Sequence, residues 1–483
     1  MSEPIQSIHD PAFRIDVLSR SDIEQIHAAT LEVLENVGVK FPLPEALDIL
    51  EAHGAQVDRA TSIARIPAPV VEDALKSAPP AYTLAARDPA RDLPLDGNHV
   101  FLGTDGCGVQ VQDAFTGELH TSTKKDVADC AQVSDALNEI GFWWAMVSAQ
   151  DCPPESRGLH ELEAAWNQTT KHLQTESLLH PGEMESAVEM AAAIAGGREE
   201  LRRKPLLSIM QCTISPLAHD PGSLEAGLIA ARAGLPVGYM TMASCASTGP
   251  ATPAGTLVVG NAEVIAALVL IQMSSPGAPV FYAGAQTAMD LRTGAYTGGG
   301  PEDFLFGAAT NQLADFYKIP LSMGAFATGA RQPDWQAGVE NSFSAFMACA
   351  SGADMLLGAG LLHGSRILSY EQMVMDCEIY SMVRRMLQGI RISADDLALD
   401  EIRAVGPGGT FLPRKHTRAH MRELWLPVLL DRRSYEEWAV KKDGAREWAG
   451  EKARDILQNH QSEPLDPKLT LELRNIIASY ERK

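Results

Sequence analysis

The feature that most constrains the fold of this chain is an alternation of apolar runs and helical patterns that begins near residue 124. The runs are short and almost free of charge, which is typical of strands buried on both faces of a parallel sheet. The segments between them have apolar residues at helical spacing, so we expect helices that cover this sheet. The expected strands are residues 140–149, 206–214, 236–244, 279–285, 320–327 and 354–362, with 172–179 as an additional one. Seven or eight such repeats in one chain favour a closed (βα)8 TIM barrel of the α/β class over an open sheet.

Segments of different character lie before and after this repeat. Residues 1–98 are expected to form an N-terminal helical segment, in which Ser21 and Asp22 can cap a first helix. The barrel is expected over residues 99–390, and short β runs around a Gly-rich stretch predict a β-hairpin insertion at its start. Residues 391–483 are charged and mainly helical, and we expect them to pack on the barrel as a C-terminal extension.

The charge balance excludes binding of a phosphate backbone as the main task of the protein. The 483 residues contain 40 Lys and Arg against 62 Asp and Glu, a formal net charge of -22. The seven cysteines form no C-x-x-C pair, so neither a disulfide framework nor a cysteine zinc site is expected. The N-terminus shows no apolar region of a secretory signal, and the most apolar stretch, residues 262–273, is too short to cross a bilayer. We therefore expect a cytoplasmic protein that binds neither membrane nor nucleic acid.

Several common catalytic motifs are absent from the sequence. No G-x-G-x-x-G follows a predicted strand, and the glycines at 298–300 precede a helix without the Lys-Ser/Thr of a P-loop. Neither a G-x-S-x-G elbow nor an HExxH pair is present. These absences disfavour dinucleotide-dependent enzymes, nucleoside triphosphatases, serine hydrolases and zinc proteases.

Polar residues follow the predicted strands at the end where a (βα)8 barrel carries its site. They are Asp105, Asp151, Glu176, Ser215, Ser244, Gln286, Asp290, Thr328, Arg331 and His363. Aromatic residues in or near the strands are Trp143, Trp144, Tyr239, Phe281, Tyr282, Tyr296 and Trp335. Carboxylates combined with aromatic rings suit a cation, because a ring face attracts a quaternary ammonium group. Aromatic residues of barrel strands are also common core residues, and adjacent Trp143 and Trp144 face opposite sides of a strand, so at most one can line the lumen.

Histidines offer two further candidate sites. His363 follows eight apolar residues and precedes Gly364, Ser365 and Arg366, which indicates either a site residue or a histidine that ties down its own loop. His416 and His420 have the spacing of metal ligands on one helix face. No third ligand is evident nearby in the sequence, so structural hydrogen bonding is the preferred interpretation and no metal is expected.

Four longer segments resemble the trimethylamine methyltransferase family of corrinoid-dependent enzymes. They are residues 101–137 (from FLGTDGCGVQVQD to VSDAL), 327–342 (ATGARQPDWQAGVENS), 352–383 (from GADMLLGAGLLHGSRILSY to YSMV) and 405–432 (VGPGGTFLPRKHTRAHMRELWLPVLLDR). The resemblance extends over residues 15–440. It implies a (βα)8 barrel that delivers a methyl group from its substrate to cob(I)alamin, giving methylcobalamin, on a separate corrinoid protein. It implies no tightly bound cofactor in this chain, and barrels of this size usually form homo-oligomers.

One departure from the family pattern concerns the substrate. The trimethylamine enzymes that this chain resembles carry pyrrolysine in the segment that precedes D-x-Q-A-G, whereas Thr328, Gly329, Ala330, Arg331 and Gln332 are all standard residues here. Without pyrrolysine the electrophilic imine that handles a tertiary amine is missing. The chain is therefore similar to the branch that demethylates quaternary amines, with glycine betaine as the first expectation and proline betaine, carnitine and γ-butyrobetaine as alternatives.

The chemistry of a quaternary amine agrees with the missing catalytic motifs. The substrate nitrogen is already positively charged, so a neutral tertiary amine, dimethylglycine in the case of glycine betaine, leaves without being protonated. No general acid, base or protein nucleophile is then required, and the task is to hold the methyl carbon in line between cobalt and nitrogen. A site that stabilises the cation too strongly would slow transfer, so we expect aromatic faces and at most one carboxylate.

The candidate residues of this site bind substrate, and no catalytic residue is assigned. His363, Arg331 and Arg366 are candidate partners for a betaine carboxylate, with His363 the first choice. Asp105 either faces the ammonium group or caps the turn that follows it, and Glu176 is more readily a surface ion-pair partner. The substrate-binding candidates are His363, Asp105, Trp143, Trp144, Tyr282, Arg331, Arg366 and Trp335.

Two other functions compete with this interpretation. A metal-dependent barrel lyase or hydrolase would need at least three ligands that converge at strand ends, with Asp105, Glu176, His363 and Asp376 as candidates. A non-catalytic betaine-binding protein would bind the same ligand without methyl transfer.

Overall fold

The computed structural model describes residues 4–482 apart from residues 107 and 297. Eight parallel strands form a closed barrel in the order in which they occur in the chain, and the last strand pairs with the first. They are β7 (His99–Gly103), β10 (Ile140–Trp144), β11 (His172–Thr175), β12 (Leu207–Cys212), β13 (Val237–Thr241), β15 (Val280–Gly284), β18 (Leu321–Gly324) and β19 (Met355–Leu357). The predicted (βα)8 TIM barrel is confirmed.

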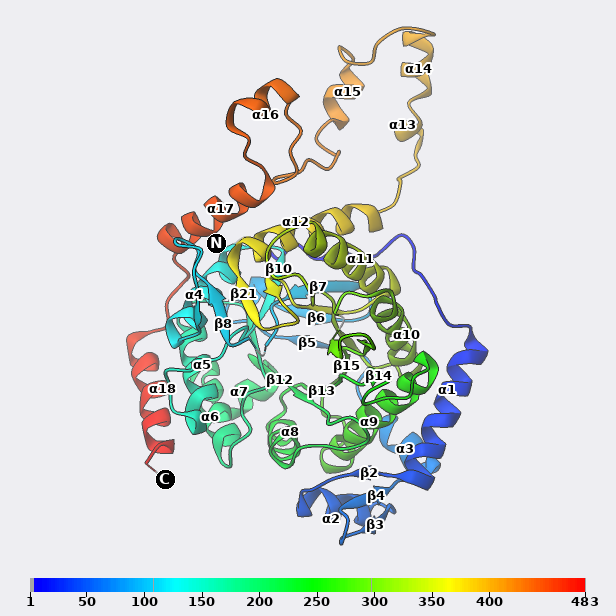
Figure 1. Cartoon of the computed structure of the whole chain (residues 1–483), viewed down its shortest axis with the longest axis vertical. Coiled ribbons are helices and arrows are strands. Elements are labelled where there is room, and N and C mark those ends of the chain that lie inside the picture. The colour runs from blue at the N-terminus through cyan, green and yellow to red at the C-terminus, as the bar shows by residue number, and fades with distance from the viewer. Residues whose placement is uncertain (1–3, 107, 297, 483) are drawn as a thin grey trace.

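Each barrel strand is followed by at least one helix, and the helices form a ring around the barrel (Figure 1). They are α4 (Lys124–Ala136), α5 (Arg157–Trp166), α6 (Glu183–Ala195), α7 (Arg198–Arg203), α8 (Pro221–Ala233), α9 (Pro253–Ser274), α10 (Pro301–Tyr317), α11 (Trp335–Ser351) and α12 (Tyr370–Leu387), with a short 3-10 turn, η3 (Pro154–Ser156), before α5. Helix α8 shows why these segments start where they do: the Asp220 carboxylate accepts hydrogen bonds from the first free N–H groups, and Pro221 occupies the first turn. Gly234 ends the same helix in the left-handed conformation.

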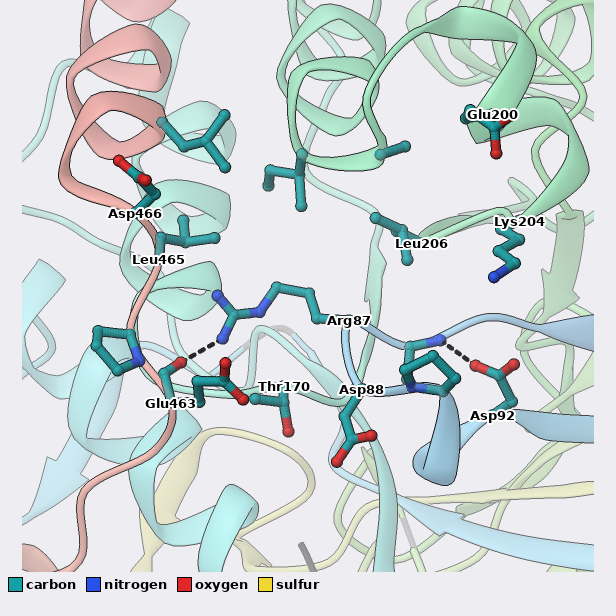
Figure 2. Close-up of a pocket in the computed structure, with 16 residues that line it drawn as sticks. Arg87, Asp88, Asp92, Thr170, Glu200, Lys204, Leu206, Glu463, Leu465 and Asp466 are labelled. Carbon is teal, nitrogen blue, oxygen red and sulfur yellow. Dashed lines mark hydrogen bonds between the residues drawn. The ribbon is translucent and has the colours of Figure 1, made fainter. Parts of the chain in front are cut away.

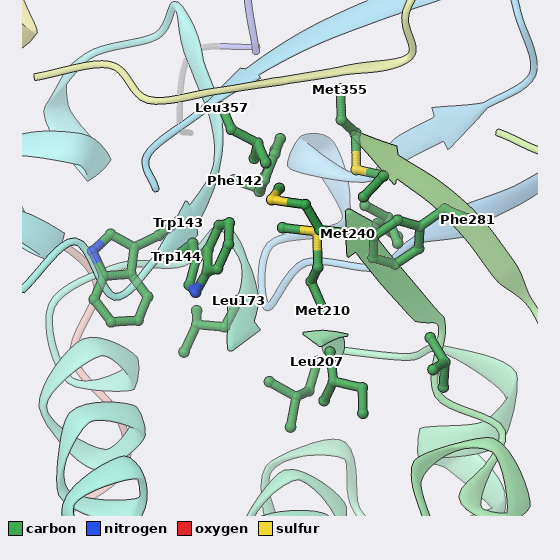
Figure 3. Packing of buried hydrophobic residues seen from close by; sticks show 14 of the residues in the cluster. Phe142, Trp143, Trp144, Leu173, Leu207, Met210, Met240, Phe281, Met355 and Leu357 are labelled. Atoms are coloured by element: carbon green, nitrogen blue, oxygen red, sulfur yellow. The ribbon is translucent and has the colours of Figure 1, made fainter. Parts of the chain in front are cut away.

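Large and small residues alternate across the barrel lumen, and Figure 3 shows the resulting packing. Phe142 is paired with Gly103 on the neighbouring strand, and Phe281 is paired with Gly238. A Cβ atom on Gly238 would lie 2.0 Å from the Phe281 ring, so the ring occupies the space that a side chain would take. The lumen below the mouth is therefore a packed core rather than a channel.

Side chains on the outer side of the strands contact the helix ring. The Tyr239 hydroxyl donates to the carbonyl oxygen of Ser223 in α8 at 3.3 Å. The Tyr282 hydroxyl donates to Asn261 in α9 at 3.2 Å. Both rings therefore lie between strand and helix, away from the lumen.

Among the helices of the described chain, α9 alone is long and apolar enough to cross a membrane by length and composition. Helix α9 spans 22 residues, because it already begins at Pro253, before the most apolar stretch at residues 262–273. The expectation that this apolar segment is too short to cross a bilayer was therefore wrong. In the most hydrophobic window, 78% of the residues are buried inside the protein. The apolar character of α9 is thus explained by its burial among the other elements of the barrel.

The N-terminal segment combines helices with small sheets. Its helices are α1 (Arg20–Glu32), α2 (Pro44–Ala52), α3 (Ala68–Leu75) and the short η1 (Val33–Val37) and η2 (Pro89–Arg91). A three-stranded sheet lies between them, built from β2 (Val39–Lys40), β4 (Ile63–Arg65) and β3 (Gln56–Asp58), and β5 (Tyr82–Leu84) pairs with β6 (Leu93–Leu95). Strand β1 (Ile8–His9) pairs antiparallel with β7. Strands of two or three residues are too short to show a period-two pattern, which explains why only helices were expected here.

Short sheets surround the mouth of the barrel. Strands β8 (Gln110–Gln112) and β9 (Leu119–Thr121) form the insertion after β7, and β20 (Leu361–Leu362) and β21 (Ile367–Ser369) form a hairpin after β19. β21 pairs with β8, so the two insertions make one four-stranded sheet that joins the beginning and the end of the barrel. A second sheet contains β14 (Ser244–Cys245), β16 (Thr287–Asp290) and β17 (Ala295–Tyr296).

The C-terminal residues divide into a projecting part and a packed part (Figure 1). We call residues 390–444 the arm; it extends away from the barrel and contains α13 (Ala394–Leu397), α14 (Leu399–Val405), α15 (Lys415–His420) and α16 (Tyr435–Lys441). Helix α17 (Ala445–Asn459) returns to pack on α12 and α4, and α18 (Pro467–Tyr480) packs on α6 and α5.

Candidate functional site

A cavity of about 320 Å³ lies at the carboxyl ends of the barrel strands. This is the end at which (βα)8 barrels carry their sites. The side chains that line it include three carboxylates, a thiol, three methionines, an amide, a guanidinium and one indole ring: Asp105, Glu176, Asp303, Cys212, Met240, Met242, Met323, Gln286, Arg366 and Trp144. The residues come from almost the whole circumference of the barrel, so the closed sheet itself brings them together.

One wall of the cavity is acidic. Asp105 follows β7, Trp144 ends β10, Glu176 follows β11 and Cys212 ends β12. These four strands are neighbours in the sheet and run parallel, so their carboxyl ends lie side by side. Residues that are far apart in the sequence thereby form one continuous surface, which we call the acidic wall.

Burial governs the electrostatics of the acidic wall. Burial, together with the negative charge of Glu176, raises the pKa of Asp105 to about 8. The backbone N–H of Gly106 donates to this carboxyl group at 2.7 Å, which opposes the shift without cancelling it. Burial and the charge of Glu176 also hold the pKa of the Cys212 thiol well above its usual range. The thiol stays protonated and donates to Glu176 Oε2 at 3.6 Å, so Cys212 is not a thiolate nucleophile.

Gly106 permits the close approach of the loop after β7. A Cβ atom at this position would lie 2.8 Å from Glu176 Oε1 and 2.9 Å from the Trp144 indole nitrogen. The backbone beside Asp105 therefore touches both side chains directly, and a larger residue would push the wall apart. Trp144 is 1% exposed, and among the residues that the structure describes its indole N–H has no hydrogen-bond partner.

The opposite wall is mostly uncharged, although Asp303, in the first turn of α10, also lines the cavity. Met240 lies in β13, Met323 lies in β18, and Gln286 follows β15. Gln286 is buried, its Oε1 accepts from the Thr310 hydroxyl at 3.3 Å, and its Nε2 has no hydrogen-bond partner within the described chain. Because a buried amide N–H is costly to leave unpaired, Gln286 is a candidate to donate to a bound ligand. Polarisable methionine side chains give this wall a surface that adapts to a methyl group.

Two buried glutamates behind the cavity hold its loops in place. Glu263, a lone carboxylate in the apolar helix α9, accepts from the hydroxyls of Thr213, Ser215 and Thr241 and from the Leu217 N–H. It thereby ties the ends of β12 and β13 to one helix. Glu161 accepts from the Ala149 N–H at 2.9 Å and from the hydroxyl of Ser177, the residue after Glu176, at 2.8 Å. Burial raises the pKa of Glu161 to about 7.

Of the eight substrate-binding candidates, three line the cavity: Asp105, Trp144 and Arg366. Glu176 and Gln286, which the sequence also placed after barrel strands, line it as well. Trp143 and Trp144 point to different sides of β10, and Trp144 is the one that faces Met240 (Figure 3). The structure thus identifies which of the two rings lines the cavity. Tyr282 points outward to Asn261 instead. One aromatic ring and three carboxylates line the described cavity, and the expectation of several rings with at most one carboxylate was therefore wrong.

The other predicted residues lie around the mouth rather than in the lining. Arg331 is exposed, and Trp335 is 81% exposed at the start of α11. His363 has a left-handed backbone, and its N–H donates to the Ala330 carbonyl oxygen at 2.7 Å. The local contacts therefore place His363 in the turn that carries Arg366 to the cavity. The polar cluster after the apolar run therefore identified the correct loop, but Arg366 rather than His363 is the residue of this loop that lines the cavity.

The ligands required for a metal-dependent barrel enzyme do not converge in the described chain. Asp105 and Glu176 line the cavity, but His363 does not, and Asp376 is buried in α12 behind it. Asp376 accepts hydrogen bonds from Asn341, Gly360 and Gln372, which is a structural arrangement. Among the described residues, the group of side chains with suitable metal-ligand geometry lies in the arm instead.

A second cavity of about 310 Å³ lies at the other end of the barrel, beside residues that precede β11 and β12 (Figure 2). Arg87 points into it and donates to the carbonyl oxygen of Glu463, which belongs to the segment between α17 and α18. The Ala86 N–H donates to Asp92 at 2.8 Å. The amino ends of barrel strands serve stability rather than chemistry in this fold, so this base cavity is not the candidate active site.

Comparison with known proteins agrees with this geometry. A family model described as "Trimethylamine methyltransferase (MTTB)" matches residues 1–483. The trimethylamine methyltransferase of Desulfitobacterium hafniense (strain DSM 10664 / DCB-2) is 36% identical, covering 97% of this chain and 95% of that protein. The glycine betaine methyltransferase of Desulfitobacterium hafniense (strain Y51) is 33% identical, covering 96% of this chain and 97% of that protein.

A solved structure supports the fold. The crystal structure of the Methanosarcina barkeri monomethylamine methyltransferase aligns with a TM-score of 0.50 and 13% sequence identity, covering 93% of this chain and 96% of that one. At this identity the likeness concerns the barrel architecture alone. The family assignment rests on the full-length match of the family model and on the identity to its relatives, and it shows that this chain belongs to the trimethylamine methyltransferase family.

Proposed function

We propose that this protein transfers a methyl group from a quaternary amine, with glycine betaine as the first candidate, to cob(I)alamin carried by a corrinoid protein. The observation that carries the proposal is the acidic wall, where burial and Glu176 raise the pKa of Asp105 to about 8. A carboxyl group in this situation is neutral at pH 7 and ionises when a cation arrives next to it. The cavity therefore favours a small positively charged ligand over a neutral or anionic one.

The relatives include both trimethylamine and glycine betaine enzymes at similar identity, so similarity does not choose between the two substrates. Residues 328–332, where the sequence analysis places the pyrrolysine of the trimethylamine enzymes, are standard amino acids. They form the loop after β18, and Glu340 fixes this loop by accepting from the Thr328 hydroxyl and the Gly329 N–H. A quaternary amine needs no electrophile there, because its nitrogen already carries the charge that makes the amine a leaving group.

The described side chains suit three tasks in this reaction. Asp105 and Glu176 hold the ammonium group, and the face of Trp144 adds a cation–π contact. The methionine wall contacts the methyl groups. Arg366 is the candidate partner for the substrate carboxylate, since it lines the cavity and can form paired hydrogen bonds.

The atoms and electrons of the step balance without a group from the protein. The bond between the methyl carbon and nitrogen breaks, and nitrogen keeps the electron pair as a neutral tertiary amine. The electron pair of cobalt(I) forms the new bond to carbon, so cobalt becomes formally cobalt(III). As the substrate loses its charge, Asp105 can take back a proton from solvent, which favours release of dimethylglycine.

The surroundings of the mouth support a protein partner that brings the corrinoid. Several large apolar side chains are exposed there: Ile214 (51%), Met242 (46%), Leu305 (51%), Trp335 (81%) and Phe343 (59%). Exposed apolar patches at a concave site mark protein interaction surfaces. In this proposal Trp335 contacts the partner rather than the substrate.

Two further expectations accompany the proposal. A homo-oligomer is supported by the arm, where large apolar residues such as Ile390 (86%), Leu412 (84%) and Val440 (82%) are exposed. A cytoplasmic location is supported by the six described cysteines, all of which are free thiols.

A spectral assay tests the function. The purified protein is mixed with cob(I)alamin and, one at a time, with glycine betaine, proline betaine, carnitine, γ-butyrobetaine and trimethylamine. The expected result is methylcob(III)alamin with a quaternary amine, and the substrate is the one with the highest initial rate. Methylation from trimethylamine alone would overturn the substrate assignment. No methylation with any amine, even when a corrinoid protein is supplied, would overturn the function.

A further inference from the structure

The described helices of the arm lack a hydrophobic core that would stabilise their fold. None of the residues described in α13, α14, α15 and α16 is buried. Helices of four to seven residues are not stable on their own in water, because each has too few hydrogen bonds to offset the cost of nucleation. Small units without a core are usually held by disulfides or metal ions, and the described arm contains no cysteine.

Three potential metal ligands meet inside the arm. Asp395 lies in α13, and His416 and His420 lie one helical turn apart in α15. One donor atom from each residue lies within 4.8 Å of the other two. His420 Nε2 is 3.2 Å from Asp395 Oδ2, and the two imidazole rings are 4.2 Å apart. In a tetrahedral zinc site with bonds near 2.0–2.1 Å, neighbouring donors are about 3.3 Å apart, so this pair already has the required separation.

The groups around these three residues fit a metal centre as well. His420 Nδ1 lies 3.1 Å from Glu423 Oε1, which directs the other ring nitrogen toward Asp395. A carboxylate on the far nitrogen of a ligating histidine is the usual outer support of a zinc site, because it fixes the tautomer and raises ligand basicity. Arg391 contacts both Asp396 and Glu423, so the outer carboxylates are held in place. Two imidazoles and one carboxylate suit zinc and related divalent transition ions rather than calcium or magnesium.

We propose that Asp395, His416 and His420 bind one zinc-class divalent ion that fastens α13 to α15 and gives the arm its fold. From the sequence we expected no metal, because no third ligand is evident near His416 and His420 along the chain. Asp395 is 21 residues before His416 and becomes adjacent only when α13 and α15 fold against each other. His416 Nε2 is 3.1 Å from the Asp395 carbonyl oxygen, so the His416 ring is also in direct contact with Asp395. His416 and His420 lie beside the C-terminal end of α12, and none of the three ligands lines the mouth cavity, so the proposal is independent of the proposed methyl transfer.

The direct test measures zinc in the full-length, untagged protein. The protein is stripped with a chelator, dialysed against micromolar zinc and then against metal-free buffer, and analysed by mass spectrometry of the metal. We expect about one zinc per chain, and at least a tenfold loss of retained zinc in His416→Ala and in His420→Ala. His53→Ala is the matched control, since His53 is the exposed residue that directly follows α2 and its Nδ1 lies 2.8 Å from the Ile49 carbonyl oxygen of that helix, so this variant should retain the zinc. Less than a tenth of an equivalent in the wild type, or equal zinc in all three variants, would overturn the proposal.

A second measurement shows whether the ion holds the arm. Limited proteolysis should cut the stripped protein within residues 390–444 at least tenfold faster than the zinc-loaded protein, while the barrel stays intact in both. Equal rates would show that zinc, even if bound, does not fasten α13 to α15, and this result would contradict the structural role. Protection that is unchanged when zinc is removed and varies only with protein concentration would show that contacts between copies of the chain, and not the ion, hold the arm together, and would overturn the proposal.

Discussion

The barrel carries one cavity at each end, and the two cavities have nearly equal volumes, about 320 Å³ at the mouth and about 310 Å³ at the base. At the base, charges of opposite sign are paired. Asp135, which accepts a hydrogen bond from the N–H of Thr170 in the lining of this cavity, contacts Arg91 at 2.6 Å and His460 at 2.9 Å. At the mouth, like charges are brought together, and Asp105 and Glu176 share one buried wall.

This difference indicates that the base of the barrel contributes to stability, whereas the mouth contributes to ligand binding. The ion pairs at the base join the barrel to the C-terminal segment that contains His460, and these pairs are complete without a ligand. The acidic wall is destabilising without a ligand, because burial and mutual repulsion oppose ionisation of Asp105. A cation supplied from outside would complete it. Substitutions at the base should therefore change stability without changing substrate affinity, and substitutions at the mouth should do the reverse.

The largest effect is expected from Asp135→Ala at the base. Removing this carboxylate leaves the Arg91 guanidinium buried without its partner, which typically costs about 3–5 kcal/mol of unfolding free energy. Urea denaturation followed by circular dichroism measures the loss, and glycine betaine affinity of the folded variant should not change. Asp431→Ala is the control, because its ion pair with Arg433 lies in the arm and should contribute less than about 1 kcal/mol. Equal losses in the two variants would contradict the role assigned to the base.

The same carboxylate predicts sensitivity to acid. Burial alone favours the neutral acid, but the hydrogen bond with His460 and the charges of Lys171 and Arg91 hold the pKa of Asp135 well below its usual range. Since the folded pKa is lower than the unfolded pKa of about 3.9, the stabilisation is complete above that value and is lost as the pH falls below it. The Asp135→Ala variant should therefore lose less stability than the wild type between pH 5 and pH 3.

The next effect concerns the pH dependence of substrate binding at the mouth. Asp105 has a pKa of about 8 in the free protein, so below pH 8 a bound cation must displace a proton from it. The dissociation constant of glycine betaine should then fall about tenfold per pH unit up to pH 8, roughly 100-fold between pH 6 and pH 8, and stay constant above. Titration calorimetry in buffers of different ionisation enthalpy measures both the affinity and the released proton. In Asp105→Asn the pH dependence should disappear; its persistence would place the titrating group elsewhere.

A smaller loss is expected from Glu176→Gln. This change keeps the shape of the side chain but removes one negative charge from the wall, which should lower kcat/KM about 30-fold, or about 2 kcal/mol. The pKa of Asp105 should move back toward its usual range, because the neighbouring charge is gone. Glu183→Gln is the matched control: Glu183 is also buried with a pKa raised to about 8 by burial, but it lies in α6 outside the cavity lining. Equal losses in both variants would show that burial, not position in the wall, determines the effect.

The sequence predicted the barrel well because a parallel sheet leaves a strong signal. Residues 207–211 of β12, for example, are buried on both faces and belong to a nearly continuous apolar run, and amphipathic helices separate such runs. The short strands of the N-terminal segment leave no such signal. The arm was expected to pack on the barrel with the rest of the C-terminal extension, yet its helices project from it (Figure 1) and none of the residues described in them is buried.

The candidate site could be predicted only in part. Asp105 was identifiable because it is a polar residue that closely follows an apolar strand. Glu176 was a candidate for the same reason, but the preferred interpretation, a surface ion-pair partner, is wrong because Glu176 lines the cavity. The methionines of the other wall carry no sequence signal that separates them from core residues, and Met240 and Met323 look like any strand residue. Glu263 could have been noticed, since a single carboxylate in the apolar stretch at 262–273 needs buried partners, and it has four. For the remaining candidates, the direction of the side chain determines whether the residue lines the cavity. Tyr282, for example, points to α9 although its neighbours in β15 point to the lumen.

The smallest effect, and the one that tests side-chain direction most closely, comes from two adjacent tryptophans. Trp144→Phe reduces the ring face that the cavity offers to a cation, so glycine betaine affinity should fall about three- to fivefold, or 0.6–1 kcal/mol. Trp143→Phe removes the same number of atoms from the other side of β10 and should change stability but not affinity. Isothermal titration of both variants against the wild type measures the difference under identical conditions. If Trp143→Phe weakened binding as much as Trp144→Phe, the effect would come from general loosening of β10, and Trp144 would have no specific role in holding the cation.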